Sequence, residues 1–516
     1  MSTVIYVFTI FLLVLQLTFP SHPNLSVRQP EVWAAPVARL FSPAETPTAV
    51  PKKVTGFSVR FHPDGPLYVG DQVSMEIIAP KGENMDGKQV EVQVDPPNGP
   101  ILGPAKFGGF GIEGRAQATL IWAWNTSGFS PGEHLLQFSL TSGGEFWTEA
   151  VTLLPASDMP SQEADAVWKQ AKSKYATIYY ISGTAAERDL PEIMKIVDQQ
   201  ATLVSEEMGV PFGDPITITL LPRVLGNGGF ANGEISLSYL DRDYMGQNFP
   251  LVLHHEMVHI LDGRMGGDLR PSILIEGLAV DLSGGHFKPE NLLPRAAALL
   301  KLPPQIDSSP GSPSGSQSDP SLGAFIPLAT LTDNFYASQH EIGYIEAGAL
   351  VKFMIQTWGW QDYNSFYRDI HPDPSGLQSK AFDNALQAHF GITLDELQTM
   401  FLDNLKTQNV SQQEVEDVRM TVMYYDTARE YQQKLDPSAY FRTAWLMDNK
   451  QMREKGIVAD YLRHPEYPQN VNLELILMAA DQSLLARRYH ETEQLLISVQ
   501  QALAYATPPV AELNAR

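Results

Sequence analysis

The chain has 516 residues, 43% of them hydrophobic, which is enough for about three domains with sizeable cores. The net charge of −23 at pH 7 argues against a nucleic-acid partner, because phosphate binding needs clustered Lys and Arg. Cysteine is absent from the sequence, which excludes disulfides, thiolate nucleophiles and Cys-ligated zinc, so any metal must be held by His, Asp or Glu.

The first residues are apolar. Residues 4–19 read VIYVFTIFLLVLQLTF without a charge, whereas a membrane-spanning helix needs about 20 residues. The pattern favours a signal peptide or a short membrane anchor within 1–27, although no Lys or Arg precedes it. The alternative is a buried strand or helix of the mature protein. We therefore expect export, to the extracellular space or the cell envelope. A linker rich in Pro, Ala and Ser is expected to follow the apolar segment, at 28–51.

Residues 52–156 alternate apolar and polar positions in short runs. Examples are VSMEII at 73–78, VEVQV at 90–94 and HLLQFSL at 134–140, with turn clusters such as DPPNGP and SPGE between runs. Six or seven strands of this kind predict a β-sandwich. The stretch WAWNTSGFSPGEHLLQF resembles bacterial immunoglobulin-like (Ig-like) modules. That resemblance implies a spacing, positioning or binding role, with a protein partner left open.

Residues from 160 to about 300 mix helical and strand patterns. We expect a helix over ADAVWKQAKSKY (164–175) and another over PEIMKIVDQQATLVSEEMG (191–209). Strands are expected at 177–182, 217–221 and 234–240, and helical patterns dominate from Pro250 onward. A sheet followed by helices indicates an α+β domain. The strand that starts at Gly233 is either an ordinary sheet strand or an edge that pairs with an extended peptide.

The segment PLVLHHEMVHILDG at 250–263 contains His255-Glu256-Met257-Val258-His259, an HExxH pattern. On a helix, residues four apart share one face, so the two imidazoles can bind one metal ion. Glu256 lies about 100° further round the helix, within reach of a water on that metal. Gly263 supplies a stop for the helix. The alternative is a core helix with hydrogen-bonded histidines.

A second helix is expected over PSILIEGLAVDLS at 271–283. Sixteen residues separate Glu276 from His259, and glycines and a proline in this gap can turn the chain back. Glu276 would then be the third ligand of a single Zn²⁺ ion, with a fourth position left for water. The alternative is a solvated surface charge, but its apolar neighbours favour a paired or metal-bound carboxylate.

VLHHEMVHIL followed by LIEGLAVDLSG resembles the gluzincin zinc metallopeptidases, in particular the peptidase MA-like branch. The resemblance covers about residues 165–407 and implies a thermolysin-like fold for a catalytic domain at 160–408. It implies that His255, His259 and Glu276 bind zinc. It further implies that Glu256 is the general base and later the proton donor. Asp262 and Met265 stand where a metzincin needs Gly and His, and the aminopeptidase pattern GxMxN is absent.

Four more residues near the motif have candidate roles. The resemblance makes Tyr344 the hydrogen-bond donor to the oxyanion, with Tyr336 in reserve. The alternative for Tyr344 is packing at a helix start. Asp281 is either a partner that orients a ligand or a surface carboxylate. His254 points about 100° away from His255, which favours a role in the core or behind the ligands.

The rest of the chain is helical after a low-complexity loop at 303–323. Thr393 with Glu396 and Ser411 with Glu414 fit the capping box that begins a helix. Residues 411–516 indicate stacked helical hairpins, similar to a tetratricopeptide unit but without a clean 34-residue repeat. These hairpins are a second place where a protein partner can bind.

These patterns together predict an exported zinc metallopeptidase that cleaves a peptide or protein substrate, touching the membrane only through a possible N-terminal anchor. The alternative is a non-catalytic envelope binding protein with a structural or vestigial zinc site. A zinc hydrolase that acts on a bond other than a peptide bond is a third reading.

Overall fold

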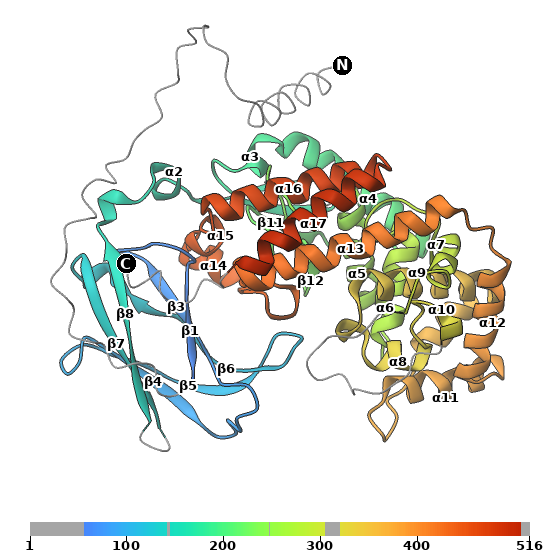
Figure 1. Cartoon of the computed structure of the whole chain (residues 1–516), viewed down its shortest axis with the longest axis horizontal. Helices are drawn as coiled ribbons and strands as arrows, with labels where there is room; N and C mark the ends of the chain where they lie inside the picture. Colours follow the sequence, from blue (N-terminus) through green and yellow to red (C-terminus); the bar gives the residue numbers. More distant parts are fainter. Residues whose placement is uncertain (1–55, 142–144, 247, 305–319, 507–516) are drawn as a thin grey trace, which may run out of the picture. The chain divides into compact units, whose positions relative to one another are not determined.

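The computed structural model of the chain describes residues 56–141, 145–246, 248–304 and 320–506. The predicted signal peptide or anchor, the linker and most of the loop at 303–323 lie outside these residues. Residues 53–516 form one unit, and every contact described below lies within it (Figure 1). Of the helices in the described ranges, none combines the length and the apolar character that crossing a bilayer requires.

The N-terminal region is all-β, as predicted. Burial alternates along the strands, most clearly in QVEVQV, because successive side chains point to opposite faces of a sheet. The eight strands are β1 (Ser58–His62), β2 (Leu67–Tyr68), β3 (Gln72–Ile78), β4 (Gln89–Val94), β5 (Ile101–Phe110), β6 (Arg115–Asn125), β7 (Gly132–Leu140) and β8 (Phe146–Leu154).

Strand β5 joins the two halves of this region. Its first part pairs with β4 and its second part, from Phe107 onward, pairs with β6. All eight strands are therefore hydrogen-bonded in one sheet, in the order β1-β3-β6-β5-β4-β7-β8-β2, instead of the two separate sheets of a simple sandwich. Both halves share one core, in which the Phe57 and Trp147 rings stack at 4.8 Å.

A second sheet of five strands follows, in the order β12-β13-β11-β10-β9. The three inner strands are parallel, and both edge strands are antiparallel to their neighbours. Helix α4 (Leu190–Met208) connects β10 to β11, as parallel strands require. The strands are β9 (Trp168–Lys172), β10 (Ala176–Ile181), β11 (Ile216–Leu221), β12 (Gly229–Ala231) and β13 (Ile235–Ser238).

One sequence prediction about this sheet is wrong, and one open alternative is decided. The segment 164–175 was expected to be a helix, but Trp168–Lys172 is the edge strand β9, antiparallel to β10. The Trp168 indole donates to the carbonyl of Ile457 at 2.7 Å, so a distant contact outweighs the local helix-forming composition. For the strand that begins after Gly233, the reading as an ordinary sheet strand is confirmed, because it is β13, which lies inside the sheet, and the edge strand is β12.

Helices follow the sheet. Helix α5 (Phe249–Met265) begins at Asn248, whose side chain accepts a hydrogen bond from the Leu251 amide. It ends at Gly266 instead of the expected Gly263. Helices α6 (Ser272–Ser283) and α9 (His340–Trp358) pack on each other, and α6 also packs on α5. The others in this part are α7 (Leu292–Leu299), α8 (Leu328–Asp333), α10 (Trp360–Arg368), α11 (Gln378–Phe390) and α12 (Leu394–Thr407). Two single turns precede α4, namely α2 (Ser161–Ala164) and α3 (Ala185–Arg188).

The C-terminal region is helical, as predicted, and it contacts both sheets. The Arg453 guanidinium binds the Glu234 carboxylate at 2.8 Å beside β13, and Arg463 binds Asp71 at 2.6 Å beside β3. Arg463 and Asp71 are buried, where leaving either charge unpaired would be costly. The helices are α13 (Gln412–Leu435), α14 (Asn449–Lys455), α15 (Ala459–Leu462), α16 (Pro468–Leu485) and α17 (Tyr489–Tyr505).

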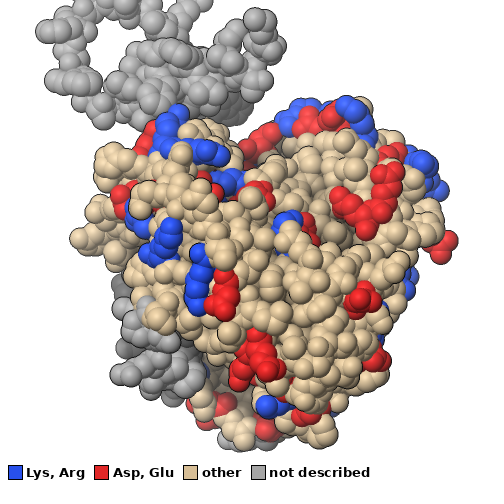
Figure 2. Space-filling view, turned by 90° about the vertical axis from the view of Figure 1, so that its right-hand side faces the viewer, with Lys and Arg blue, Asp and Glu red and all other residues tan. Residues whose placement is uncertain are grey.

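Charges on one face of the molecule are mixed in sign. Figure 2 shows the side that carries α12 in Figure 1, where Lys and Arg lie among Asp and Glu on a mostly uncharged surface. Some exposed charges form pairs along one helix, such as Lys406 with Asp403 at 2.9 Å in α12. The expected absence of a nucleic-acid partner stays a prediction from net charge.

Candidate metal centre

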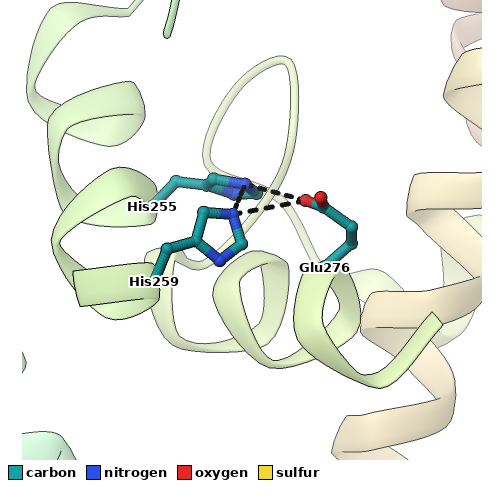
Figure 3. A group of neighbouring side chains, drawn as sticks. All are labelled: His255, His259 and Glu276. Carbon is teal, nitrogen blue, oxygen red and sulfur yellow. Dashed lines mark hydrogen bonds and ion pairs between the residues drawn. The ribbon is translucent and has the colours of Figure 1, made fainter. Parts of the chain in front are cut away.

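Helix α5 presents two histidines on one face. The Nε2 atoms of His255 and His259 lie 3.0 Å apart, and both side chains are largely buried. The spacing of four residues produces this arrangement, because it places the second ring one turn along the same face. Figure 3 shows both rings directed toward the next helix.

Helix α6 brings Glu276 to the two rings. Its Oε2 atom lies 3.2 Å from Nε2 of His255 and 3.4 Å from Nε2 of His259 (Figure 3). These three side chains are the one group of His, Cys, Asp and Glu in the described ranges whose donor atoms could together hold a metal ion. The structure thus brings together the three ligands that the sequence predicts.

Gly277 lets α6 approach α9 closely. A Cβ atom at this position would lie 2.4 Å from the carbonyl oxygen of Ala347 and 2.7 Å from a methyl group of Val351. Gly348 makes the reciprocal approach on α9, where a Cβ would meet Val280 at 2.4 Å. The glycine after Glu276 therefore sets the depth at which α6 packs, and with it the position of the carboxylate.

Gly277→Ala should lower the free energy of unfolding by about 1–3 kcal/mol, the usual effect of overpacking a core. Thermal unfolding would show this as a lower melting temperature. Gly263→Ala in α5 is the matched control, because its Cβ would come no closer than 3.8 Å to another side chain. A helix-interior alanine at that position should be neutral or stabilising. Equal melting temperatures for the two variants would contradict this role of Gly277.

Tyr336 fixes the second oxygen of Glu276. Its hydroxyl donates to Oε1 at 2.6 Å, while Oε2 faces the two histidines. The pKa of Tyr336 is raised, first by burial and then by the Glu276 charge, so the phenol stays protonated as a donor. Sequence reasoning held Tyr336 in reserve for the oxyanion. Its hydroxyl instead engages a candidate ligand, a contact that orients ligating carboxylates in metal sites.

The spacing of the three donor atoms fits zinc. Zinc binds His nitrogen and carboxylate oxygen at about 2.0–2.2 Å in a tetrahedron, whose corners are then about 3.3 Å apart. The observed separations run from 3.0 to 3.4 Å. Two imidazoles with one carboxylate also match the ligand set of catalytic zinc sites, which leave one corner open.

The electrostatics of the cluster favour a cation. Burial lowers the pKa of His255 to about 4, which keeps that imidazole neutral. For His259, the Glu276 charge and hydrogen bond outweigh burial and raise the pKa to about 9. Burial also opposes ionisation of Glu276, but His259 and His255 outweigh it and hold the pKa of Glu276 well below its usual range. The carboxylate thus draws positive charge to the point between the rings.

Zinc affinity should therefore rise with pH up to about 9, the pKa of His259. Below that value His259 carries a proton, and zinc binds only the neutral imidazole, so uptake of the metal releases a proton. The expected slope is up to tenfold per pH unit. Chelator competition at several pH values measures it, and an affinity that does not change with pH would contradict this.

Glu256 lies beside the cluster. It is 5% exposed, and its Oε2 atom is buried without a hydrogen-bond partner in the described part of the chain. Burial raises its pKa to about 7, the value that suits a general base at neutral pH. Gly229 of β12 leaves room for this carboxylate, because a Cβ there would lie 2.9 Å from Oε1 of Glu256.

A cavity of about 240 Å³ joins these groups. Its polar lining includes Glu256 and the three candidate ligands, and its apolar lining comes from distant parts of the chain. Strand β12 contributes Gly229–Ala231 along one side. Because β12 is the edge of its sheet, one edge of its backbone has no partner strand among the residues that the structure describes. The cavity therefore combines a metal centre with an open strand edge.

Tyr344 also lines the cavity. Its ring lies 6.3 Å from that of His255, and its pKa is well above the usual value, chiefly because it is buried. It stacks at 4.2 Å on His286, which sequence reasoning missed. Nδ1 of His286 lies 2.7 Å from the buried Glu341 carboxylate, so this imidazole is held in place at the cavity wall. An isolated histidine after two glycines gives no motif that would have identified it.

The other two candidate residues, His254 and Asp281, contact side chains that are not part of the metal cluster. Nitrogens Nδ1 and Nε2 of His254 lie 2.9 Å from the side chains of Gln200 and Glu207, which fixes α5 to α4. Asp281 accepts from Lys352 at 3.1 Å, so its bond goes to α9 instead of to a ligand. Neither residue lines the cavity.

Comparison with known proteins adds one distant likeness. No protein-family model matches the chain, and no curated protein matches it. Among solved structures, the chain is similar to an aminopeptidase N family protein from Idiomarina loihiensis, with 11% sequence identity and a TM-score of 0.29. The alignment covers 70% of this chain and 77% of that chain. A TM-score this low does not establish a common fold, so the centre is interpreted from its own geometry.

Proposed function

We propose that the protein is a zinc metallopeptidase in which His255, His259 and Glu276 hold one zinc ion. The observation that carries the proposal is the near-tetrahedral spacing of their donor atoms, 3.0–3.4 Å apart, in a cavity that also contains the buried, partnerless Oε2 of Glu256. A structural zinc site usually has four protein ligands, whereas three ligands beside a buried carboxylate favour catalysis.

Zinc in such a site lowers the pKa of a water molecule to about 7 and polarises the carbonyl under attack. Glu256 accepts the proton of the attacking water and then gives it to the nitrogen of the leaving amine. Burial supports this cycle, because a carboxyl with a pKa near 7 can both accept and donate a proton at neutral pH. Because the carboxylate is only 5% exposed, its electrostatic interaction with the reacting groups is stronger than it would be in bulk water.

Tyr344 is the proposed donor to the oxygen that gains charge. Its phenol stays protonated at neutral pH, and its ring lies at the cavity wall near His255. His286 stacks on this ring and so restricts its position. A preorganised donor of this kind contributes about 2.7–4 kcal/mol of transition-state stabilisation.

The substrate is proposed to be an extended peptide or protein segment. The open edge of β12 borders the cavity at Gly229–Ala231, and main-chain hydrogen bonds to such an edge would bind any sequence in one register. Strand β12 contacts α5, and Gly229 lies beside Glu256, so a peptide paired at this edge would run close to that carboxylate. The gluzincin resemblance of the motif residues supports the same reading.

The finer architecture is part of the proposal. We infer a thermolysin-like arrangement for the five-stranded sheet with α5, α6 and α9, and an Ig-like fold for the N-terminal β region. Export to the extracellular space or cell envelope rests on residues 4–19 alone. The proposed peptide hydrolysis does not depend on these assignments, because it rests on the metal centre alone.

The test is metal content together with hydrolysis of a denatured protein. We expect one zinc ion per chain by mass spectrometry, and proteolysis that a chelator abolishes and added zinc restores. Bound zinc with no hydrolysis of any peptide or protein would favour a structural zinc site in a binding protein. Hydrolysis of esters or amides other than peptides, without proteolysis, would support the catalytic metal centre but would show that its substrate is not a peptide.

A further inference from the structure

The tip of the β5–β6 hairpin carries an exposed apolar residue into the cavity wall. Ile112 lies in the turn between these strands and is 48% exposed. It nevertheless lines the cavity that contains the candidate metal centre. This isoleucine is therefore not part of the core of the N-terminal region, and its side chain is open to a molecule in the cavity.

The hairpin tip is fixed in place by the C-terminal region. The Glu113 amide donates to the carbonyl oxygen of Arg442 at 3.2 Å. Gly111 has a left-handed backbone, with φ 65°, and a Cβ there would lie 2.3 Å from the same oxygen. Only glycine permits both the turn and this close approach. Ile112, between these two anchors, consequently has a defined position.

Phe441, next to Arg442 in the chain, forms another part of the same wall. Its ring lies 6.2 Å from that of Tyr336, and the Arg429 guanidinium lies over it at 4.4 Å. Phe230 of β12 also lines the cavity, on the open strand edge. Three apolar residues from three separate parts of the chain thus line the cavity that contains the metal centre.

We propose that Ile112, Phe230 and Phe441 form an apolar subsite that selects a bulky apolar side chain of the substrate. The inference rests on the proposed function, because it assumes that a peptide occupies this cavity. It also makes the N-terminal β region part of the substrate site instead of a spacer. The physical basis is the burial of apolar surface on both partners, which a polar substrate side chain would not gain.

The experiment compares two peptides that differ only in one residue beside the scissile bond, Leu or Ser. Binding is measured to protein that carries Glu256→Gln, so that no turnover is needed, with and without Ile112→Ser. We expect Ile112→Ser to weaken binding of the Leu peptide about tenfold or more and to leave the Ser peptide within about twofold. Ile121→Ser is the matched control, since Ile121 is 51% exposed on β6 and does not line the cavity.

Equal changes for both peptides, no change for either, or no preference for Leu over Ser would overturn the subsite. Failure of the proposed function has a different signature, because the unsubstituted protein would then hydrolyse neither peptide. A loss with Ile121→Ser as large as that with Ile112→Ser would also overturn the assignment, since it would reflect damage to the sheet.

Discussion

Replacing Glu256 with glutamine should lower the rate of peptide hydrolysis by about 10²–10⁴-fold while the zinc content stays the same. Glutamine has the shape of glutamate but cannot take a proton from water. The carboxylate is 5% exposed and its Oε2 has no hydrogen-bond partner among the described residues, so the substitution breaks no hydrogen bond to that atom there. Because Glu256 is not one of the three clustered donors, metal binding should persist.

The measurement is kcat and zinc content for the variant and the unsubstituted protein, assayed with the same denatured protein substrate. Glu192→Gln is the matched control, since that side chain is 63% exposed on α4. Its kcat should be unchanged. If Glu256→Gln hydrolysed the substrate as fast as the unsubstituted protein, Glu256 would not be the general base.

Glu276→Ala should abolish both zinc binding and activity. The substitution removes one of three donors and leaves two neutral imidazoles 3.0 Å apart. It also removes the charge that raises the pKa of His259 against the effect of burial. Mutating a residue that only hydrogen-bonds to a metal ligand typically lowers metal affinity by about 10–100-fold. Loss of a ligand itself should therefore lower zinc affinity by more than about 100-fold.

Metal analysis after dialysis measures this effect, with kcat as the second readout. Asp281→Ala on the same helix is the matched control, because Asp281 bonds to Lys352 and does not contact the centre. It should keep one zinc ion per chain. Full zinc retention in Glu276→Ala would remove Glu276 from the ligand set.

The sequence predicted correctly those features that depend on residues a few positions apart. The HExxH spacing places both imidazoles on one face of α5 by helix geometry alone, and the glycine-rich gap allows α6 to return with Glu276. Both capping boxes, at Thr393 and Ser411, are present at the starts of α12 and α13. These features depend on residues a few positions apart, which a single sequence displays.

Features that depend on distant contacts were not predictable. Trp168–Lys172 becomes a strand because β10 and the carbonyl of Ile457 bind it, although its composition favours a helix. The end of α5 falls at Gly266, whose φ of 82° is left-handed, instead of at Gly263. The sequence therefore showed that a glycine would end the helix, but it did not show which glycine adopts the left-handed backbone conformation.

The surroundings of the centre show the same limit. Tyr336 is sixty positions from Glu276 in the chain, yet its hydroxyl bonds to that carboxylate. His286 has no motif around it and is held by Glu341 across a separation of 55 residues. The hairpin residue Ile112 lines the cavity beside a distant contact, in which the Glu113 amide bonds to the Arg442 carbonyl and Gly111 lies close to the same oxygen. Ligand types and spacing were visible in the sequence, whereas the groups that orient them were not.

The most direct measurement is anomalous diffraction at the zinc absorption edge from crystals of the metal-loaded protein. We expect one zinc peak per chain, at about 2.0–2.2 Å from Nε2 of His255, Nε2 of His259 and a carboxylate oxygen of Glu276. A zinc peak elsewhere in the molecule, or a zinc-free cluster in protein that is fully active, would contradict this expectation.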